Sequence, residues 1–193
     1  AGILAIGRPD QYLYPYFIKD LKSGDIDRQH ALELIEELLI KLSNNILMLP
    51  SFAKDTGSEL GADSMAPTFG GLTMDGEDAT NELTYLFLDA VKDLRAMSNS
   101  YSVRLSPKSP PELYRKLSEV QAVTSGIALF NDSVIISALE NCGCSREDAL
   151  DYSIIGCVEP TSQGNTFGCT SGNDVSLAGC LEMTFTRGRI RTM

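Results

Sequence analysis

Two side chains in the C-terminal part of the chain are close enough in sequence to act on one small molecule. Cys157 and Glu159 lie in the run Gly156-Cys157-Val158-Glu159-Pro160. Gly156 lets the backbone turn tightly, and Pro160 stiffens the exit from the run. A thiol and a carboxylate on such a restrained loop can face the same cavity. The alternative, from spacing alone, is a small buried cysteine beside a surface glutamate, which is a common arrangement.

The charges near Cys157 favour a neutral thiol over a thiolate. A nucleophilic cysteine normally needs a histidine or another positive group that stabilises the thiolate. The single histidine, His30, is far away in a helical pattern. Glu159 disfavours the thiolate by like-charge repulsion. A neutral thiol suits the exchange of a hydrogen atom with a carbon, so an ionic cysteine hydrolase is the less favoured alternative.

Alternating strand and helix patterns must position these two residues. Apolar residues at helical spacing predict helices at about 28–45, 78–97, 110–123, 132–141 and 174–187. Strands are predicted at 65–72 and 102–105, and Ile154-Ile155 forms a brief strand that leads into Gly156. Residues 128–130 form a short apolar run, 51–64 and 160–172 are loop-like, and 1–26 hold an unassigned aromatic cluster. The alternation favours an α/β architecture built on a buried sheet.

Residues with special backbone or capping preferences mark the ends of these elements. Asp27 and Ser145 are predicted N-caps, and Gly188 is a predicted C′ residue. The Pro110-Pro111 pair opens a helix, where proline is tolerated in the first turn. Asp75-Gly76 signals a turn.

The composition is that of an ordinary globular protein. The chain has 193 residues, of which 43% are hydrophobic and 22% are charged. Acidic residues outnumber basic ones by 26 to 16, and the net charge of -10 argues against nucleic acid as a partner. No apolar run approaches the roughly 18 residues of a membrane span. We interpret both ends, which lack an initial Met and any signal peptide, as cuts through a larger protein.

The cysteines favour a reducing compartment and do not form a recognisable metal motif. There are five of them, and an odd number without a secretory signal fits reduced thiols in the cytoplasm. The pair Cys142 and Cys144 falls short of zinc-site spacing, because no second pair or nearby histidine accompanies it. We predict no bound metal, and we expect Cys169 and Cys180 to serve packing.

Residues 151–160, Asp-Tyr-Ser-Ile-Ile-Gly-Cys-Val-Glu-Pro, resemble the active-site cysteine loop of the glycyl radical enzymes, in the superfamily of pyruvate formate-lyase. The branch of glycerol/diol dehydratases and choline trimethylamine-lyases is the most similar. Further stretches agree in the family's order, namely 8–16, 70–71, 75–76, 78–83 and 129–132. The resemblance covers the whole chain, so residues 1–193 are expected to be a single fragment of the family's barrel. The N-terminal part and the C-terminal glycyl radical domain are then absent.

The resemblance implies a fold and a mechanism. The fold is part of a ten-stranded α/β barrel with the cysteine loop as a central finger. A glycyl radical, installed by a radical S-adenosylmethionine activase, takes hydrogen from Cys157. The thiyl radical abstracts hydrogen from a small hydroxylated substrate, Glu159 acts as general base, and water or an amine is eliminated. No other cofactor is implied, and the family implies a cytoplasmic lyase of anaerobic metabolism that forms a homodimer at full length.

Departures from the family's patterns narrow the expectation. Gly156 stands where ketoacid formate-lyases have a second cysteine, which disfavours acyl transfer. The radical-adding succinate synthases lack a carboxylate at the position of Glu159, whereas some aryl-acetate decarboxylases share the Cys-x-Glu arrangement and stay an alternative. Residues 168–172 read Gly-Cys-Thr-Ser-Gly where many dehydratases read Gly-Trp-His-Asp, which disfavours glycerol. A truncated, non-catalytic homologue is the alternative from another class.

Four further residues are candidates for the substrate cavity. Thr170 and Ser171 are expected to line it, although such loop residues also commonly bond their own backbone. Phe130 and Phe69 are candidate walls of the cavity, and core packing is the alternative for both.

Overall fold

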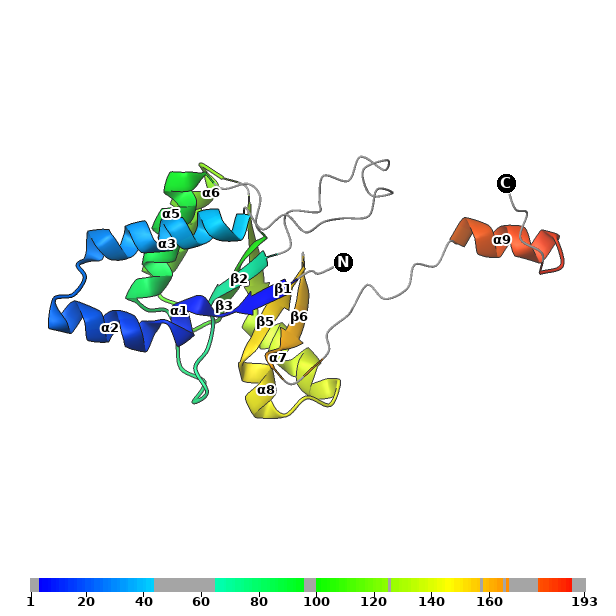
Figure 1. The fold of residues 1–193 in the computed structure, drawn as a ribbon. Helices are drawn as coiled ribbons and strands as arrows, with labels where there is room; N and C mark the ends of the chain where they lie inside the picture. Colours follow the sequence, from blue (N-terminus) through cyan, green and yellow to red (C-terminus); the bar gives the residue numbers. More distant parts are fainter. Residues whose placement is uncertain are drawn as a thin grey trace.

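The central sheet contains four parallel strands that follow one another in chain order (Figure 1). The computed structural model describes residues 4–43, 65–95, 100–124, 126–156, 158–164, 166 and 177–188. The strands are β1 (Leu4–Gly7), β2 (Met65–Gly70), β3 (Tyr101–Leu105) and β4 (Ile127–Asn131). Ser102 of β3 pairs with Thr68 of β2 on one side and with Ala128 of β4 on the other.

Helices connect these strands, as parallel pairing requires. The chain passes from β1 to β2 through α1 (Pro9–Tyr12), α2 (Tyr14–Ser23) and α3 (Arg28–Ser43). It then passes through α5 (Glu82–Leu94) to β3 and through α6 (Pro111–Gln121) to β4. Figure 1 shows α3, α5 and α6 together on one side of the sheet.

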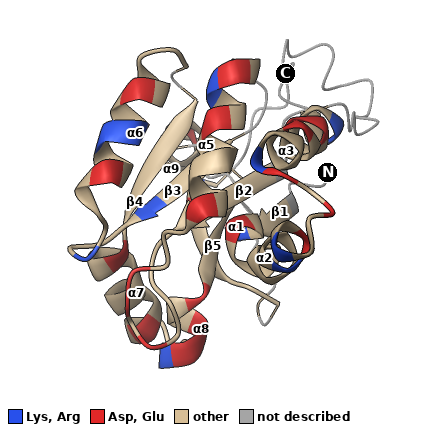
Figure 2. Cartoon of the chain, turned by 90° about the vertical axis from the view of Figure 1, so that its left-hand side faces the viewer, with Lys and Arg blue, Asp and Glu red and all other residues tan. Residues whose placement is uncertain are grey.

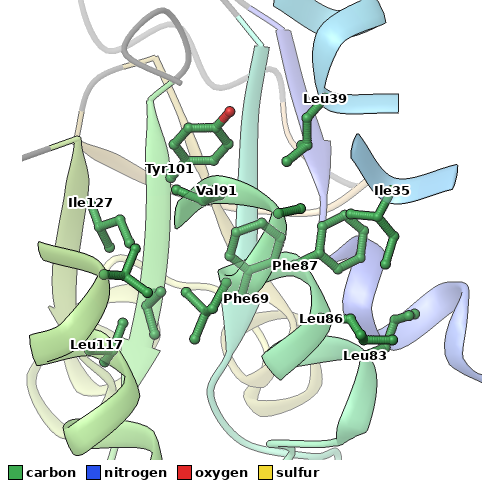
Figure 3. Packing of buried hydrophobic residues seen from close by; sticks show 14 of the residues in the cluster. Ile35, Leu39, Phe69, Leu83, Leu86, Phe87, Val91, Tyr101, Leu117 and Ile127 are labelled. Atoms are coloured by element: carbon green, nitrogen blue, oxygen red, sulfur yellow. The ribbon is translucent and has the colours of Figure 1, made fainter. Parts of the chain in front are cut away.

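The helix-covered face of the sheet holds the main hydrophobic core. Side chains alternate between the faces of a strand, so Tyr101 and Val103 of β3 both point toward the helices and are fully buried. Phe69 of β2 stacks on Phe87 of α5, with 4.9 Å between the ring centroids (Figure 3). Burial of each such large side chain stabilises the fold by about 1.5–3 kcal/mol. This core fixes the sheet against its helices.

The opposite face of the sheet is polar and is also buried. Thr68, Ser102 and Arg104 are fully buried there. An antiparallel hairpin of β5 (Tyr152–Ile155) and β6 (Glu159–Ser162) contacts this face. α7 (Asp132–Asn141) and α8 (Arg146–Leu150) lie between β4 and the hairpin and share a second, smaller core with it. α9 (Leu177–Phe185) is the last described helix.

The prediction of an α/β fold built on a buried sheet is confirmed, and the strands of that sheet are parallel. The helices predicted at about 28–45, 110–123 and 132–141 are α3, α6 and α7, and the predicted strands are β2, β3 and β5. Both predicted N-caps accept backbone hydrogen bonds: Asp27 Oδ1 from His30 at 2.8 Å and Ser145 Oγ from Asp148 at 3.0 Å. The predicted turn at Asp75-Gly76 lies between Thr73 and Glu77, whose backbones are hydrogen-bonded.

The structure corrects two predicted segments and assigns a third that the sequence left open. The helix expected from residue 78 begins at Glu82, because Asn81 and Thr84 form a reciprocal capping box. The loop expected from residue 160 contains strand β6, where Pro160 is tolerated at the edge of a two-stranded sheet. The unassigned residues 1–26 contain β1, α1 and α2. Residues 51–64, predicted to be a loop, lie outside the described residues.

The charges are concentrated on the helices. Figure 2 shows acidic residues on α3, α5, α6, α7 and α8, whereas the strands are largely free of them. Among the described helices, none is both long and apolar enough to cross a membrane.

Gly71 gives a direct test of the packing on the polar face. Its φ is +88°, and a Cβ at this position would lie 2.5 Å from Arg104 Nε. Gly76 has a similar φ of +77° but no atom within 4 Å of the same point. We expect Gly71→Ala to lower the free energy of unfolding by about 1–3 kcal/mol more than Gly76→Ala, since both share the backbone strain and only Gly71 also clashes.

Urea denaturation measures the difference in the free energy of unfolding between the two variants. Both are made in the parent protein, which is the polypeptide that contains this chain. Equal losses for the two variants would show that Arg104 does not pack against Gly71.

Candidate active site

Glu159, one of the two residues predicted to carry chemistry, lies at the turn end of the β5–β6 hairpin. In its register Tyr152 pairs with Ser162 and Ile155 pairs with Glu159, so residues 156–158 connect the two strands. Gly156 is buried with a φ of +66°, a backbone conformation that glycine adopts without strain. Cys157 itself lies outside the described residues, and its chain neighbours on both sides are at this end of the hairpin.

Glu159 is half-buried, and its carboxylate turns toward the same end of the hairpin. Its Oε2 accepts a hydrogen bond from the backbone N–H of Val158 at 2.9 Å. The carboxylate therefore lies beside the connection that contains Cys157. A carboxylate held there by one neutral amide keeps lone pairs with which it can accept a proton.

Arg104 anchors the base of the hairpin to the central sheet. Its guanidinium forms two parallel hydrogen bonds with the Asp132 carboxylate, Nε to Oδ1 and Nη2 to Oδ2, both at 2.9 Å. It also donates to the carbonyl oxygens of Tyr152 at 2.7 Å and Leu150 at 2.9 Å. Both charged side chains are fully buried. One side chain of β3 thus contacts α7, α8 and β5.

Tyr152 completes this cluster from the hairpin side. Its ring lies 3.8 Å from the Arg104 guanidinium carbon, and its hydroxyl donates to Asp132 Oδ1 at 2.7 Å. Burial raises the pKa of Tyr152 far above its ordinary value, so the hydroxyl stays protonated and acts as a donor. Asp132 is the first residue of α7, where Asn131 caps the helix by accepting from the backbone of Ser133. The helix start therefore aims the carboxylate at Arg104.

Arg8 provides a second attachment. It donates to the carbonyl oxygens of Gly70 at 2.8 Å and Leu72 at 3.0 Å, and it pairs with Asp151 Oδ1 at 3.1 Å. The backbone oxygen of Asp151 also accepts from the Gln163 side chain at 2.9 Å. The residue directly before β5 is thereby tied both to the end of β2 and to the end of β6.

Two further contacts secure β2 and β5. Thr68 Oγ1 accepts from the backbone N–H of Ile154 at 3.0 Å, within the buried interface. Asp10, which is fully buried, accepts from the Gly70 backbone and from the Thr84 hydroxyl, each at 2.7 Å. Burial raises the pKa of Asp10, and its hydrogen bonds oppose that shift. β2 is therefore restrained at the end where it supports the hairpin.

The other predicted cavity residues are placed differently. Phe69 is fully buried in the helix-side core, which favours its packing role. Phe130 is half-buried; it packs against the smaller core and lines a groove together with Leu105 and Tyr114. Thr170 and Ser171 lie outside the described residues, as does Cys169. The structure thus brings Glu159 to the hairpin end, and the roles of the others stay predictions.

The anchoring residues were not predicted from the sequence. Arg104 is a charged residue inside a predicted buried strand. Because a charged side chain is seldom fully buried without a partner, this position could have indicated a buried ion pair. The signal for Asp132 was its place at the start of a predicted helix. Their pairing depends on the adjacency of β3 and β4, which no local pattern contains.

Comparison with known proteins identifies the family. Residues 2–192 match the sequence profile described as Pyruvate formate lyase-like, so the chain belongs to the pyruvate formate-lyase-like family of glycyl radical enzymes. It is 35% identical to a (2S)-3-sulfopropanediol dehydratase of Klebsiella oxytoca, over 96% of this chain and 23% of the relative. It is 33% identical to an isethionate sulfite-lyase of Oleidesulfovibrio alaskensis, over 97% of this chain and 23% of the relative.

Solved structures agree. A Roseburia inulinivorans structure described under 1,2-propanediol dehydration matches with a TM-score of 0.83 and 35% identity. The match covers 96% of this chain and 24% of that protein. This chain therefore spans about a quarter of the length of its relatives and has the fold of the corresponding part of an α/β barrel.

The Arg104–Asp132 pair yields a stability prediction. Asp132→Asn keeps the shape of the side chain but leaves the Arg104 charge buried without a counter-charge, which we expect to cost about 3–5 kcal/mol. The matched control is Asp89→Asn on α5, whose partner Lys116 lies on α6 at a partly exposed site. Loss of that pair is expected to cost less than about 1 kcal/mol.

Urea denaturation of both variants in the parent protein makes the comparison. Similar losses at the two sites would contradict an anchoring role for the buried pair.

Proposed function

We propose that this chain is the thiyl-bearing part of a glycyl radical lyase that eliminates water, an amine or another leaving group from a small hydroxylated substrate. In this proposal Cys157 exchanges hydrogen with the substrate and Glu159 is the general base. The observation that carries it is the Glu159 carboxylate turned toward the hairpin end that contains Cys157. Membership in the family of radical dehydratases and lyases supports it.

The proposed reaction is balanced in hydrogen and in electrons. The glycyl radical of the complete enzyme supplies the unpaired electron by taking the thiol hydrogen of Cys157. The Cys157 sulfur then removes a hydrogen atom from the substrate carbon that bears the hydroxyl. Glu159 accepts the hydroxyl proton, and the electron pair of the adjacent bond departs with the leaving group. The proton then passes from Glu159 to the departing group, which restores the carboxylate. Cys157 then returns its hydrogen atom to the product radical, and the thiyl formed in this way takes hydrogen back from the glycine, so no external oxidant or reductant is consumed.

The surroundings of Glu159 suit a base that takes a proton from a neutral hydroxyl group. The buried cations near the hairpin, Arg8 and Arg104, are engaged with Asp151 and Asp132. In the described part of the chain, Glu159 forms no ion pair that would hold its proton-accepting oxygens. The Val158 amide instead restrains the carboxylate without neutralising its charge. Thr170, Ser171 and Phe130 are proposed to border the substrate.

The complete enzyme is proposed to need a radical S-adenosylmethionine activase and to act as a cytoplasmic homodimer in anaerobic metabolism. Residues 1–193 are proposed to be one continuous piece of its barrel. The free thiols of Cys142, Cys144 and Cys180 are compatible with a reducing compartment. Neither a membrane nor nucleic acid is proposed as a partner.

Cys157→Ser in the activated parent protein tests the thiyl role. We expect the glycyl radical signal in electron paramagnetic resonance to persist and product release to stop, because an O–H bond is too strong to replace the thiol as a hydrogen relay. Cys142→Ser, at an exposed thiol after α7, is the control and should leave turnover unchanged. Undiminished turnover by Cys157→Ser would overturn the assignment.

Glu159→Gln tests the general base. The amide keeps the size of the side chain but cannot accept the hydroxyl proton, so we expect turnover to fall about 100- to 10,000-fold while radical content is retained. Glu147→Gln, on the exposed surface of α8, is the control. A Glu159→Gln enzyme as fast as the parent protein would exclude the base role.

The same assays separate the alternatives. A decarboxylase would release carbon dioxide from an aryl acetate and leave hydroxylated substrates unchanged. A non-catalytic homologue would acquire no glycyl radical when treated with an activase. An anaerobic screen of diols, amino alcohols, hydroxyproline and hydroxyalkyl sulfonates identifies the substrate among the classes that elimination can use.

A further inference from the structure

We propose that Arg8, Arg104 and Asp132 are positioning residues that set the place of Cys157 by clamping the base of the β5–β6 hairpin. This inference rests on the proposed function in one respect, namely that Cys157 relays hydrogen. It goes further because it assigns control of that relay to buried charges at the opposite end of the hairpin.

The hairpin is attached to the central sheet mainly through side chains. Its two strands pair with each other in a sheet of their own, separate from β1–β4. Arg104 donates to the carbonyl oxygens of Leu150 and Tyr152, and Thr68 accepts from the backbone of Ile154. These three contacts fall on alternate residues, so one edge of the chain from 150 to 154 is bonded to the polar face of the sheet.

The two guanidinium groups hold this base from the ends of β1 and β3, the two strands that flank β2. Arg8 reaches Asp151 from the segment after β1, and Arg104 reaches the neighbouring carbonyl groups from β3. Burial lowers the pKa of Arg8 below its ordinary value, and the charge of the nearby Arg104 lowers it further. Each is held by its own carboxylate, Asp151 for Arg8 and Asp132 for Arg104. The clamp thus consists of two ion pairs whose cations lie near each other.

The clamp acts on Cys157 through the length of the hairpin. Tyr152 and Ile155, the first and last residues of β5, are three residue steps apart, which corresponds to about 10 Å of extended strand. A small rotation at the base therefore displaces the turn end by a larger distance. Hydrogen transfer requires reacting atoms in near contact, and a misplacement of about 1 Å can lower a rate on the order of 100-fold. A few buried hydrogen bonds can thereby control the relay without touching the substrate.

The test uses exchange between the radical and the solvent, which needs no substrate. In D₂O the thiol of Cys157 acquires deuterium and passes it to the glycine when it transfers a hydrogen atom. When the Cys157 sulfur then takes the protium atom from that glycine, deuterium stays on the radical carbon. The doublet in electron paramagnetic resonance collapses at the rate of this relay. Radical content, measured in the same spectrum, reports whether the protein is folded and activated.

Two mild variants alter the clamp. Tyr152→Phe retains the ring against Arg104 and removes only the hydroxyl bond to Asp132. Asp151→Ala removes the carboxylate that pairs with Arg8, at a side chain that is itself 47% exposed. The matched control is Tyr101→Phe, which removes a buried hydroxyl from the helix-side core of β3. We expect exchange per radical to slow about tenfold or more in the first two variants and to stay unchanged in the control.

The outcomes separate positioning from stability. Slower exchange at unchanged radical content supports the clamp. The clamp is contradicted if Tyr152→Phe and Asp151→Ala both exchange at the parent rate. It is also contradicted if total exchange falls only in proportion to the radical content. If the parent protein exchanges through Cys157 but releases no product from hydroxylated substrates, the proposed elimination fails while the clamp stands.

Discussion

The buried ion pair of Arg104 and Asp132 is the interaction on which the rest of this structure depends. Removing two charges from water costs several kcal/mol for each ion, and this cost is recovered only if geometry and additional hydrogen bonds are favourable. Here the pair is bidentate, and two of the three remaining guanidinium N–H groups donate to the backbone oxygens of residues 150 and 152. The charge is therefore stable only when the hairpin is in place, which couples the sheet to the hairpin.

The two faces of the sheet have different roles. The helix-covered face is apolar and supplies the hydrophobic stabilisation of the fold, with Phe69 and Phe87 at its centre (Figure 3). The other face is polar and specifies one position for the hairpin through directional bonds. Apolar packing tolerates small shifts, whereas a bidentate charge pair fixes both distance and angle. A relay that depends on near contact between atoms needs the second kind of restraint.

Local patterns in the sequence predicted the elements better than their interactions. Helical spacing and capping residues such as Asp27 and Ser145 were sufficient for α3, α7 and α8, because these signals act within one turn. Strand β6 was missed because Pro160 signals a break unless its hydrogen-bonding partner is known. The Arg104–Asp132 pair depends on the adjacency of two strands, and the Arg8–Asp151 pair joins residues 143 positions apart. Glu159 was singled out from its spacing to Cys157 and from the family resemblance.

The central claim is that the clamped hairpin presents Cys157 and Glu159 to one substrate. The most direct measurement is a crystal structure of the parent protein with its substrate bound. The account predicts the Cys157 sulfur at about 3–3.5 Å from the carbon-bound hydrogen site of the substrate. It also predicts a Glu159 oxygen within about 2.6–3.2 Å of the adjacent hydroxyl. A substrate bound elsewhere, or contacted by only one of these two residues, would contradict the account.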